Sequence, residues 1–229
     1  MKRSSRSHHA PKPATSRAHG WFFTFEGPEG SGKTTQIRKL SEYLTERGHT
    51  VLITREPGGT PCGDAIRSLF LQTPGGHLEA ETEMFLMLAQ RTEHWRKVIK
   101  PARDAGNIVL CDRYIDSSLA YQGYGRGLGA DRILSIHQEF LGDCLPDLTI
   151  VFSIDPRDGL KRAQAGGKTR LDRMESEQIG FHHRVHAGYL ELSHRFPERF
   201  AVVDASGQID ATYAQILAVV EAMHPELLT

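Results

Sequence analysis

Residues 27–34 of the chain read Gly27-Pro28-Glu29-Gly30-Ser31-Gly32-Lys33-Thr34, the pattern Gly-x-x-x-x-Gly-Lys-Thr. The aromatic run Trp21-Phe22-Phe23-Thr24-Phe25 precedes it and predicts a buried strand. After it, apolar residues at Ile37, Leu40 and Leu44 have helical spacing. A strand, a glycine-rich loop and a helix in this order predict a P-loop, and this context argues against a chance match.

A P-loop binds polyphosphate through its backbone. Its glycines let the chain wrap closely around the phosphates with the N–H groups pointing inward, and the helix N-terminus adds positive potential. In this arrangement Lys33 would reach the β- and γ-phosphates, and the Thr34 hydroxyl would bind Mg²⁺. We therefore predict phosphate binding here, while the reaction has to be inferred from other residues.

The composition is that of an ordinary globular protein of 229 residues with zero net charge, so it predicts no nucleic-acid binding. No apolar run approaches the roughly 20 residues of a membrane helix, so we expect no membrane partner. Cys62, Cys111 and Cys144 lack metal-ligand spacing and favour a reducing, cytoplasmic location.

The first twenty residues differ from the rest of the chain. They carry five basic residues and no acidic one, among Ser, His and Pro, with no apolar segment of a secretory signal. We predict a disordered basic tail at 1–20 and one domain at 21–229. An organelle transit peptide is the alternative for the tail.

Four further apolar runs predict strands, and helical patterns separate most of them. The runs are 51–54, 107–111, 148–154 and 200–204. Helical patterns cover 79–100, a short stretch around 117–122, the residues that follow Pro156 to about 163, and the ranges 181–189 and 209–223. This alternation predicts an α/β fold with three layers, in which a five-stranded parallel sheet has helices on both faces. The phosphate site is expected at the carboxyl edge of the sheet.

Charged residues follow two of these strands directly. Asp112 and Arg113 end the run at 107–111, and we expect Asp112 near Mg²⁺ and Arg113 as a phosphate clamp. Arg55 and Glu56 end the run at 51–54. They either face the ligand side of the sheet or form an ordinary surface pair.

Arg91 lies on the apolar stripe of the helix predicted at 79–100. An arginine at such a position either extends its charged end to solvent or faces a polar cavity as an anion ligand. The first interpretation is the more common one.

Each of two glycine-containing stretches allows two interpretations. Residues 164–175 combine Gly166-Gly167 with Lys168, Arg170 and Arg173, which is typical of a closing lid with basic side chains, or else of a solvated charged loop. The glycines of 123–129 indicate a mobile or ligand-contacting loop, or only a flexible turn.

From about residue 21 to its end, the chain resembles the thymidylate kinase family, P-loop enzymes that phosphorylate dTMP. The resemblance rests on 25–35, on Thr54-Arg55-Glu56-Pro57-Gly58-Gly59-Thr60, on 98–101, and on Asp112-Arg113-Tyr114 with Ser117 to Gly123. Shorter matches continue at 125–127, 146–149 and 171–173. The Arg-Glu-Pro-Gly-Gly-Thr and Asp-Arg-Tyr stretches are far more diagnostic than the P-loop.

The resemblance implies a phosphoryl transfer from ATP with Mg²⁺ and assigns residues to it. The implied metal ligands are Thr34 and Asp112, and the implied catalytic residues are Lys33, Arg113, Arg170 and Lys168. ATP would be bound by Gly27, Pro28, Glu29, Gly30, Ser31, Gly32, Lys33, Thr34 and Thr35. dTMP would be bound by Glu29, Arg55, Pro57, Met87, Arg91, Arg113, Ser118, Tyr121 and Gln122.

Within the dTMP set the family likeness suggests individual roles. Glu29 matches a contact to the sugar 3′-hydroxyl, Arg113 the acceptor phosphate, and Arg91 a thymine carbonyl. Tyr121 would crowd the position of a 2′-hydroxyl, and Ser118 and Gln122 would line the base and sugar pocket. The family is usually a homodimer, and helix residues 84–99 would contribute to its interface.

The chain departs from many relatives in two places. Met87 stands where they have a phenylalanine that stacks on thymine, which puts the base preference in question. The lid is longer, and the P-loop has no arginine, as in the bacterial subgroup in which the lid supplies the catalytic cation. We expect Arg170 in that role, with Lys168 as the second candidate.

The chemistry of a monophosphate acceptor agrees with these residues. Its second pKa near 6 leaves it mostly dianionic at neutral pH, so the reaction needs charge neutralisation and alignment and no general base. A deoxynucleoside kinase, the alternative, would need a carboxylate base such as Glu56 or Asp112. A guanine-nucleotide switch would need an Asn-Lys-x-Asp run, which the sequence lacks.

Overall fold

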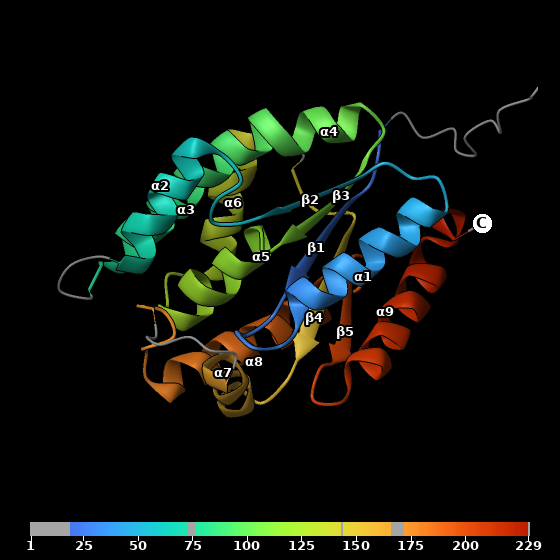
Figure 1. The fold of residues 1–229 in the computed structure, drawn as a ribbon. Helices are drawn as coiled ribbons and strands as arrows, with labels where there is room; N and C mark the ends of the chain where they lie inside the picture. Colours follow the sequence, from blue (N-terminus) through green and yellow to red (C-terminus); the bar gives the residue numbers. More distant parts are fainter. Residues whose placement is uncertain (1–18, 73–76, 143, 166–171, 229) are drawn as a thin grey trace, which may run out of the picture.

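The structure is a computed structural model that describes residues 19–72, 77–142, 144–165 and 172–228. Its described part contains a five-stranded sheet in which every neighbouring pair of strands is parallel. This confirms the predicted sheet (Figure 1). In spatial order the strands are β2 (Val51–Arg55), β3 (Ile108–Asp112), β1 (Phe22–Glu26), β4 (Leu148–Ser153) and β5 (Phe200–Asp204).

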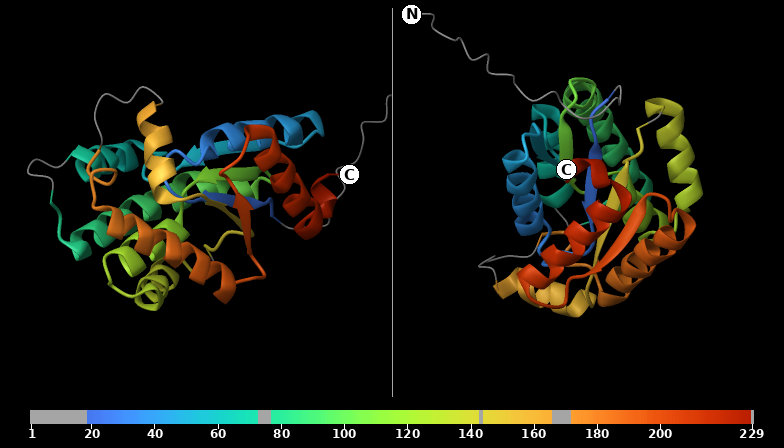
Figure 2. Two further views of the ribbon diagram at one scale, coloured as in Figure 1. Left: turned by 90° about the horizontal axis from the view of Figure 1, so that it is seen from below. Right: turned by 90° about the vertical axis from the view of Figure 1, so that its right-hand side faces the viewer.

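One face of the sheet is covered by α1 (Lys33–Glu46) and α9 (Ile209–Met223), which lie side by side (Figure 2). Successive side chains of a strand point to opposite faces. Phe23 and Phe25 of β1 therefore pack with Ile37 and Leu40 of α1 in one buried cluster. This packing fixes the start of α1, and with it the P-loop, against the end of β1.

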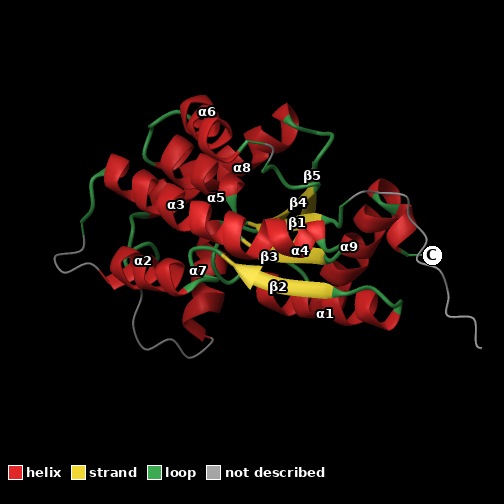
Figure 3. Cartoon of the chain, turned by 90° about the horizontal axis from the view of Figure 1, so that it is seen from above, coloured by secondary structure: helices red, strands yellow, loops and turns green. Residues whose placement is uncertain are grey.

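The other face is covered by a long helical run together with α6 (Ala130–Leu141) and α8 (Ile179–Arg195). The run consists of α3 (Ala80–His94), a π-helix (Trp95–Ile99) and α4 (Lys100–Asp104). It replaces the single helix predicted at 79–100. Figure 3, seen from above, shows β2 at the edge of the sheet with α1 beside it.

Two helices lie outside the predicted set. They are α2 (Pro61–Gln72), which packs on α3, and α6. The short helical stretch expected around residues 117–122 is present as α5 (Ile115–Ser118) and a second π-helix (Leu119–Gly125). The remaining described helices are α7 (Pro156–Ala165) and the 3₁₀ turn Pro225–Leu227.

The predicted tail lies outside the described residues apart from His19 and Gly20. Within the described part of the chain, none of the helices has both the length and the apolar character needed to cross a membrane.

Candidate active site

The P-loop connects the end of β1 at Glu26 to the start of α1 at Lys33. Gly30 has φ +70°, and a Cβ atom there would come within 2.0 Å of the Gly159 carbonyl oxygen on α7. A larger residue would therefore require both a strained backbone and a displaced helix. Glycine at this position lets the loop close tightly, as the motif predicts.

The Lys33 ammonium is buried and held across its own loop. It donates to the carbonyl oxygens of Pro28 at 2.8 Å and Gly27 at 3.2 Å. Burial, and then the nearby positive charge of Arg113, lower the pKa of Lys33 to about 8. The amine is thus mostly protonated at neutral pH, and bound phosphates would stabilise that charge further.

The two predicted metal ligands come from different elements and meet. Thr34 is on α1, and Asp112 ends β3, which pairs with β1 in a register that places Asp112 opposite Phe25. The Thr34 hydroxyl donates to Asp112 Oδ2 at 3.1 Å. A hydroxyl and a carboxylate are hard oxygen donors, which Mg²⁺ prefers alongside phosphate oxygens and water. Among the described residues, no three His, Cys, Asp or Glu side chains gather as a further metal site.

Arg113 has a strained backbone, with φ +68°, and a guanidinium that faces the P-loop. Its Nη2 donates to Glu29 Oε1 at 2.8 Å, and the guanidinium lies over the Tyr121 ring. Burial alone would lower the pKa of Arg113, but Tyr121 and Glu29 raise it well above its ordinary value. The predicted clamp is therefore a fixed positive charge beside the P-loop.

Below the P-loop lies a carboxyl group that the sequence analysis did not single out. Glu26 is fully buried and accepts hydrogen bonds from Tyr114 N at 2.7 Å, Ser117 Oγ at 2.5 Å and Tyr189 Oη at 2.9 Å. Burial raises the pKa of Glu26 to about 7. These bonds join β1, the turn after β3 and α8, and so hold Arg113 in place. A charged residue at the end of an apolar strand was the available signal.

Arg91 does not extend to solvent, so the more common interpretation of its position is wrong. Its side chain is 1% exposed and forms an ion pair with Glu56 at 2.7 Å. It also donates to Ser118 Oγ, the Tyr114 carbonyl oxygen and His137 Nε2. Burial, together with the charge of Arg91, lowers the pKa of His137 to about 4, so this histidine is a neutral acceptor. The side chain therefore lies in a polar interior.

Glu56 and Arg55 do not pair with each other, so the surface-pair interpretation is also wrong. Glu56 points inward, where Arg91 and His94 lower its pKa although burial opposes them. Arg55 is exposed and reaches Asp64 at 3.4 Å. Successive side chains at the end of a strand point to opposite faces of the sheet, so Glu56 points inward while Arg55 points to solvent.

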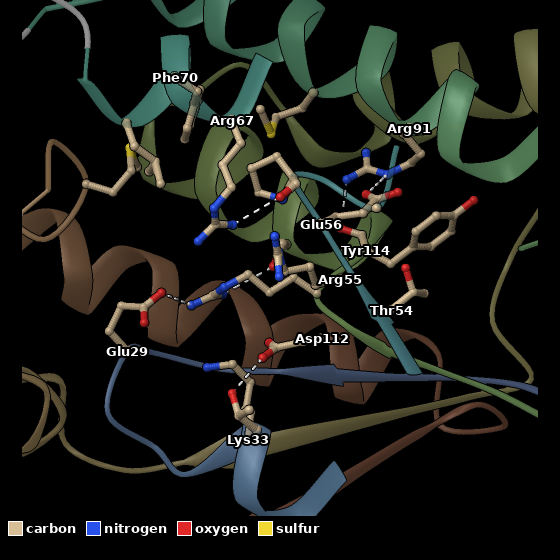
Figure 4. Close-up of a pocket in the computed structure, with 18 of the residues that line it drawn as sticks. Glu29, Lys33, Thr54, Arg55, Glu56, Arg67, Phe70, Arg91, Asp112 and Tyr114 are labelled. Atoms are coloured by element: carbon tan, nitrogen blue, oxygen red, sulfur yellow. Dashed lines mark hydrogen bonds and ion pairs between the residues drawn. The ribbon is translucent and has the colours of Figure 1, made fainter. Parts of the chain in front are cut away.

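Arg67 was missed because α2 was missed. Its Nη1 donates to the Pro57 carbonyl oxygen at 3.0 Å, and it lines the same cavity as Arg55. Figure 4 shows Arg67 and Arg55 pointing toward the same part of that cavity, with Glu29 and Lys33 on its opposite side. The helical spacing of Ile66 and Phe70 was the signal that could have located it.

A single cavity of about 1350 Å³ joins these groups. Its volume exceeds the ~300–1,000 Å³ of most small-molecule sites, which leaves room for two nucleotides. Every predicted dTMP residue lines it, whereas Gly27, Pro28 and Ser31 of the predicted ATP set do not. The predicted residues that line it are Glu29, Gly30, Gly32, Lys33, Thr34, Thr35, Arg55, Pro57, Met87, Arg91, Asp112, Arg113, Ser118, Tyr121 and Gln122.

The structure describes only part of the predicted lid at 164–175. Lys168 and Arg170 lie outside the described residues. Arg173 is buried against Phe70 and forms an ion pair with Glu83 at 2.5 Å, so it is neither a free lid cation nor a solvated charge. Arg126, in the glycine-rich stretch at 123–129, is likewise paired with Glu83. Residues 123–125 of that stretch belong to a π-helix that packs mainly on α8 and α6, and the Arg126 pair connects the stretch to α3.

The parallel sheet, the P-loop at the end of its central strand β1, and the facing cations define a P-loop kinase. The sequence model of thymidylate kinase matches residues 25–216. The chain belongs to the thymidylate kinase family.

Individual relatives agree with this assignment. The chain is 47% identical over 201 residues to the thymidylate kinase of Geobacillus sp. (strain WCH70), covering 88% of this chain and 96% of the relative. It is 46% identical to that of Desulfovibrio desulfuricans, with 88% and 95% covered. The crystal structure of thymidylate kinase from Ehrlichia chaffeensis superposes with a TM-score of 0.71 at 34% identity, covering 88% of this chain and 98% of that one.

Proposed function

We propose that the protein transfers the γ-phosphoryl group of ATP to dTMP, which gives dTDP for dTTP synthesis. Membership of the thymidylate kinase family supports the reaction. The observation that carries the proposal is the single cavity in which the P-loop faces a set of arginines. These cations are suited to an acceptor that is itself an anion.

The chemical task is to bring two phosphates together. Arg113 would hold the acceptor phosphate, Lys33 would contact the transferred group, and Arg55 and Arg67 would add positive charge from the opposite wall. Because an acceptor dianion attacks without losing a proton, these residues need only align and neutralise the reactants.

The pyrimidine would lie at the far end of the cavity, against α3. Met87 would pack on the ring, and Tyr121 would face the sugar. Arg91 has five N–H donors, of which four are used by the contacts above, so its remaining Nη2 hydrogen is available to a base carbonyl. Its ion pair with Glu56 keeps this donor in place.

The adenosine part of ATP would occupy a second cavity beside the P-loop. This cavity shares Gly30, Gly32 and Thr35 with the large one, so a nucleotide could extend from one into the other. Arg162 of α7 and the turn at 206–209 form its opposite wall. In this proposal the triphosphate would lie between the two cavities, over the P-loop.

Thr34 and Asp112 would hold Mg²⁺ through their oxygen atoms. An ion held by these two side chains would supply positive charge that offsets the negative charge of the phosphates. The direct hydrogen bond between these two side chains keeps both oxygens on the phosphate side of the cavity.

The rival function is a deoxynucleoside kinase, which needs a carboxylate to accept a proton from a hydroxyl. Of the two candidates, Glu56 is enclosed between Arg91 and His94, and Asp112 is engaged by Thr34. Neither is free to act as that base in this geometry, so these contacts support the monophosphate acceptor.

A coupled assay of ADP release tests the proposal. With ATP and Mg²⁺, we expect turnover of dTMP and none of thymidine, because only dTMP has an acceptor phosphate for Arg113. EDTA should stop the reaction and added Mg²⁺ should restore it. Turnover of thymidine with none of dTMP would establish the rival function instead.

The proposal includes a homodimer formed through α3 and α6. Phe85 on α3 is 59% exposed, and Phe140 on α6 is 58% exposed. Large apolar side chains that stay exposed on neighbouring helices are typical of a surface that another chain covers. We expect sedimentation velocity to give a dimer that Phe85→Glu converts to a monomer. A monomeric wild-type protein would contradict this part of the proposal.

We also place the protein in the cytoplasm. Cys62 is exposed and Cys111 is buried, and within the described part of the chain neither forms a disulfide. Cysteines that form no disulfide suit a reducing compartment. Recovery of the protein outside the cytoplasmic fraction of its cells would overturn this assignment.

A further inference from the structure

We propose that Glu83 is a positioning residue that selects the pyrimidine by fixing the orientation of the Gln122 amide. The inference rests on the proposed dTMP site. Glu83 is on α3, has 0% exposure and is not among the residues that line the cavity. It therefore acts through Gln122, which does line the cavity.

The Glu83 carboxylate accepts four hydrogen bonds from three side chains. Oε1 accepts from Arg173 Nη1 at 2.5 Å and Arg126 Nη2 at 2.8 Å. Oε2 accepts from Arg126 Nε at 3.1 Å and Gln122 Nε2 at 3.2 Å. A carboxylate has about four acceptor positions, so this one is fully used.

The surroundings prevent the carboxylate from moving. Arg126 binds it with two parallel bonds and also pairs with Glu177. Arg173 donates to the Phe70 carbonyl oxygen at 2.8 Å, and its guanidinium lies over the Phe70 ring. A two-bond arginine contact fixes direction as well as distance. Glu83 is therefore a rigid reference point for the side chain of Gln122.

This geometry determines which atom of Gln122 faces the ligand. An ionised carboxylate only accepts, so the amide must turn its NH₂ group toward Glu83. The carbonyl oxygen Oε1 is then the atom left for the cavity, and within the described part of the chain no donor pairs with it. Helical spacing puts Glu83 on the same face of α3 as Met87, four residues on, so the amide lies beside the expected base site.

An acceptor at this position distinguishes pyrimidines by their ring nitrogen. Thymine and uracil carry an N–H at N3, which can donate to Oε1 of Gln122. The cytosine N3 carries a lone pair instead, so it would face a lone pair of Oε1 and the two atoms would repel each other. A buried polar mismatch of this kind is strongly rejected. If Gln122 could turn over, its NH₂ group would suit cytosine equally well.

The test compares Glu83→Gln with Glu177→Gln. Both remove a carboxylate that contacts Arg126, but only Glu83 contacts Gln122. An amide at position 83 can donate or accept, so it no longer fixes Gln122. We expect the ratio of kcat/KM for dTMP to that for dCMP to fall about tenfold or more in Glu83→Gln, mainly through a higher KM for dTMP. The ratio should not change in Glu177→Gln.

Loss of one negative charge beside two arginines could also unfold the protein, so thermal unfolding is measured for each variant. If Glu83→Gln does not fold, Glu83→Gln/Arg173→Gln restores the charge balance, and Arg173→Gln alone is its control. The double variant should lose the dTMP preference and the control should keep it.

An unchanged ratio in the folded Glu83 variant, with only kcat or stability reduced, would overturn the inference. The wild-type rate with dTMP provides a separate result. If the wild-type protein does not turn over dTMP, the proposed function itself fails, and the inference about Glu83 fails with it.

Discussion

Lys33→Met should lower the turnover number by about 10²- to 10³-fold, the usual effect of removing one preorganised donor from a transition state. The Lys33 ammonium is buried at the mouth of the P-loop and is held by the carbonyl oxygens of Gly27 and Pro28. Methionine keeps the length and the apolar stem of the side chain but provides no charge near the transferred phosphoryl group. Steady-state ADP release at saturating ATP and dTMP measures the effect.

The matched control is Lys39→Met on the same helix. Lys39 pairs with Asp210 at 2.6 Å on the surface, and it lines neither cavity. We expect this variant to keep the wild-type rate. Burial of the Lys33 charge is unfavourable, as its lowered pKa indicates, so Lys33→Met should not unfold the protein. A folded Lys33→Met enzyme with near-normal turnover would contradict the assignment of this lysine to the reaction.

The sequence was sufficient for the elements that depend on local pattern. The strand, the glycine-rich loop and the helix around Lys33 follow one another within 26 residues, Trp21 to Glu46, and each has its own signal. The order of alternating strands and helices then determined the parallel sheet, because such crossovers have few alternatives. The meeting of Thr34 and Asp112 followed from the same rule, since carboxyl ends of neighbouring parallel strands share an edge.

The partners of buried charges could not be predicted in this way. Arg91 and Glu56 are 35 residues apart, and Glu26 and Tyr189 are 163 apart. Nothing in the local sequence indicates which distant carboxylate a buried arginine will meet. The sequence analysis therefore favoured a solvent-exposed end for the Arg91 side chain, because most arginines extend to solvent. In the structure, the buried carboxylate of Glu56 lies beside it instead.

The spacing of apolar residues also gave wrong predictions where a helix was not a regular α-helix or was short. The apolar stripe at 79–100 predicted one helix, but the run contains a π-helical segment at Trp95–Ile99 before α4. Periodicity reports the mean spacing of apolar residues and cannot distinguish a local widening of the helix. In α2, the helical spacing of Ile66 and Phe70 extends over a short segment with only twelve residues, and the helix that carries Arg67 was overlooked.

Arg113→Met should have the largest effect of any substitution considered for this site, with turnover reduced by about 10³-fold or more. The Arg113 guanidinium is fixed by Glu29, Ser117 and the Tyr121 ring, so it is preorganised for a phosphate. Its removal would leave the acceptor dianion without its nearest permanent charge. The KM for dTMP should also rise, because under the proposed role the phosphate of bound dTMP would contact Arg113 in the ground state as well.

Arg113→Lys separates charge from geometry. Lysine keeps the positive charge but lacks the planar fork that binds two phosphate oxygens, so we expect only partial recovery of turnover. Arg195→Met is the control, because Arg195 pairs with Asp131 on an exposed part of the surface and does not line the cavity. Calorimetric titration with dTMP in the absence of ATP provides a second readout. If Arg113→Met bound dTMP as tightly as the wild-type protein, the clamp on the acceptor phosphate would have to be assigned to Arg55 or Arg67 instead.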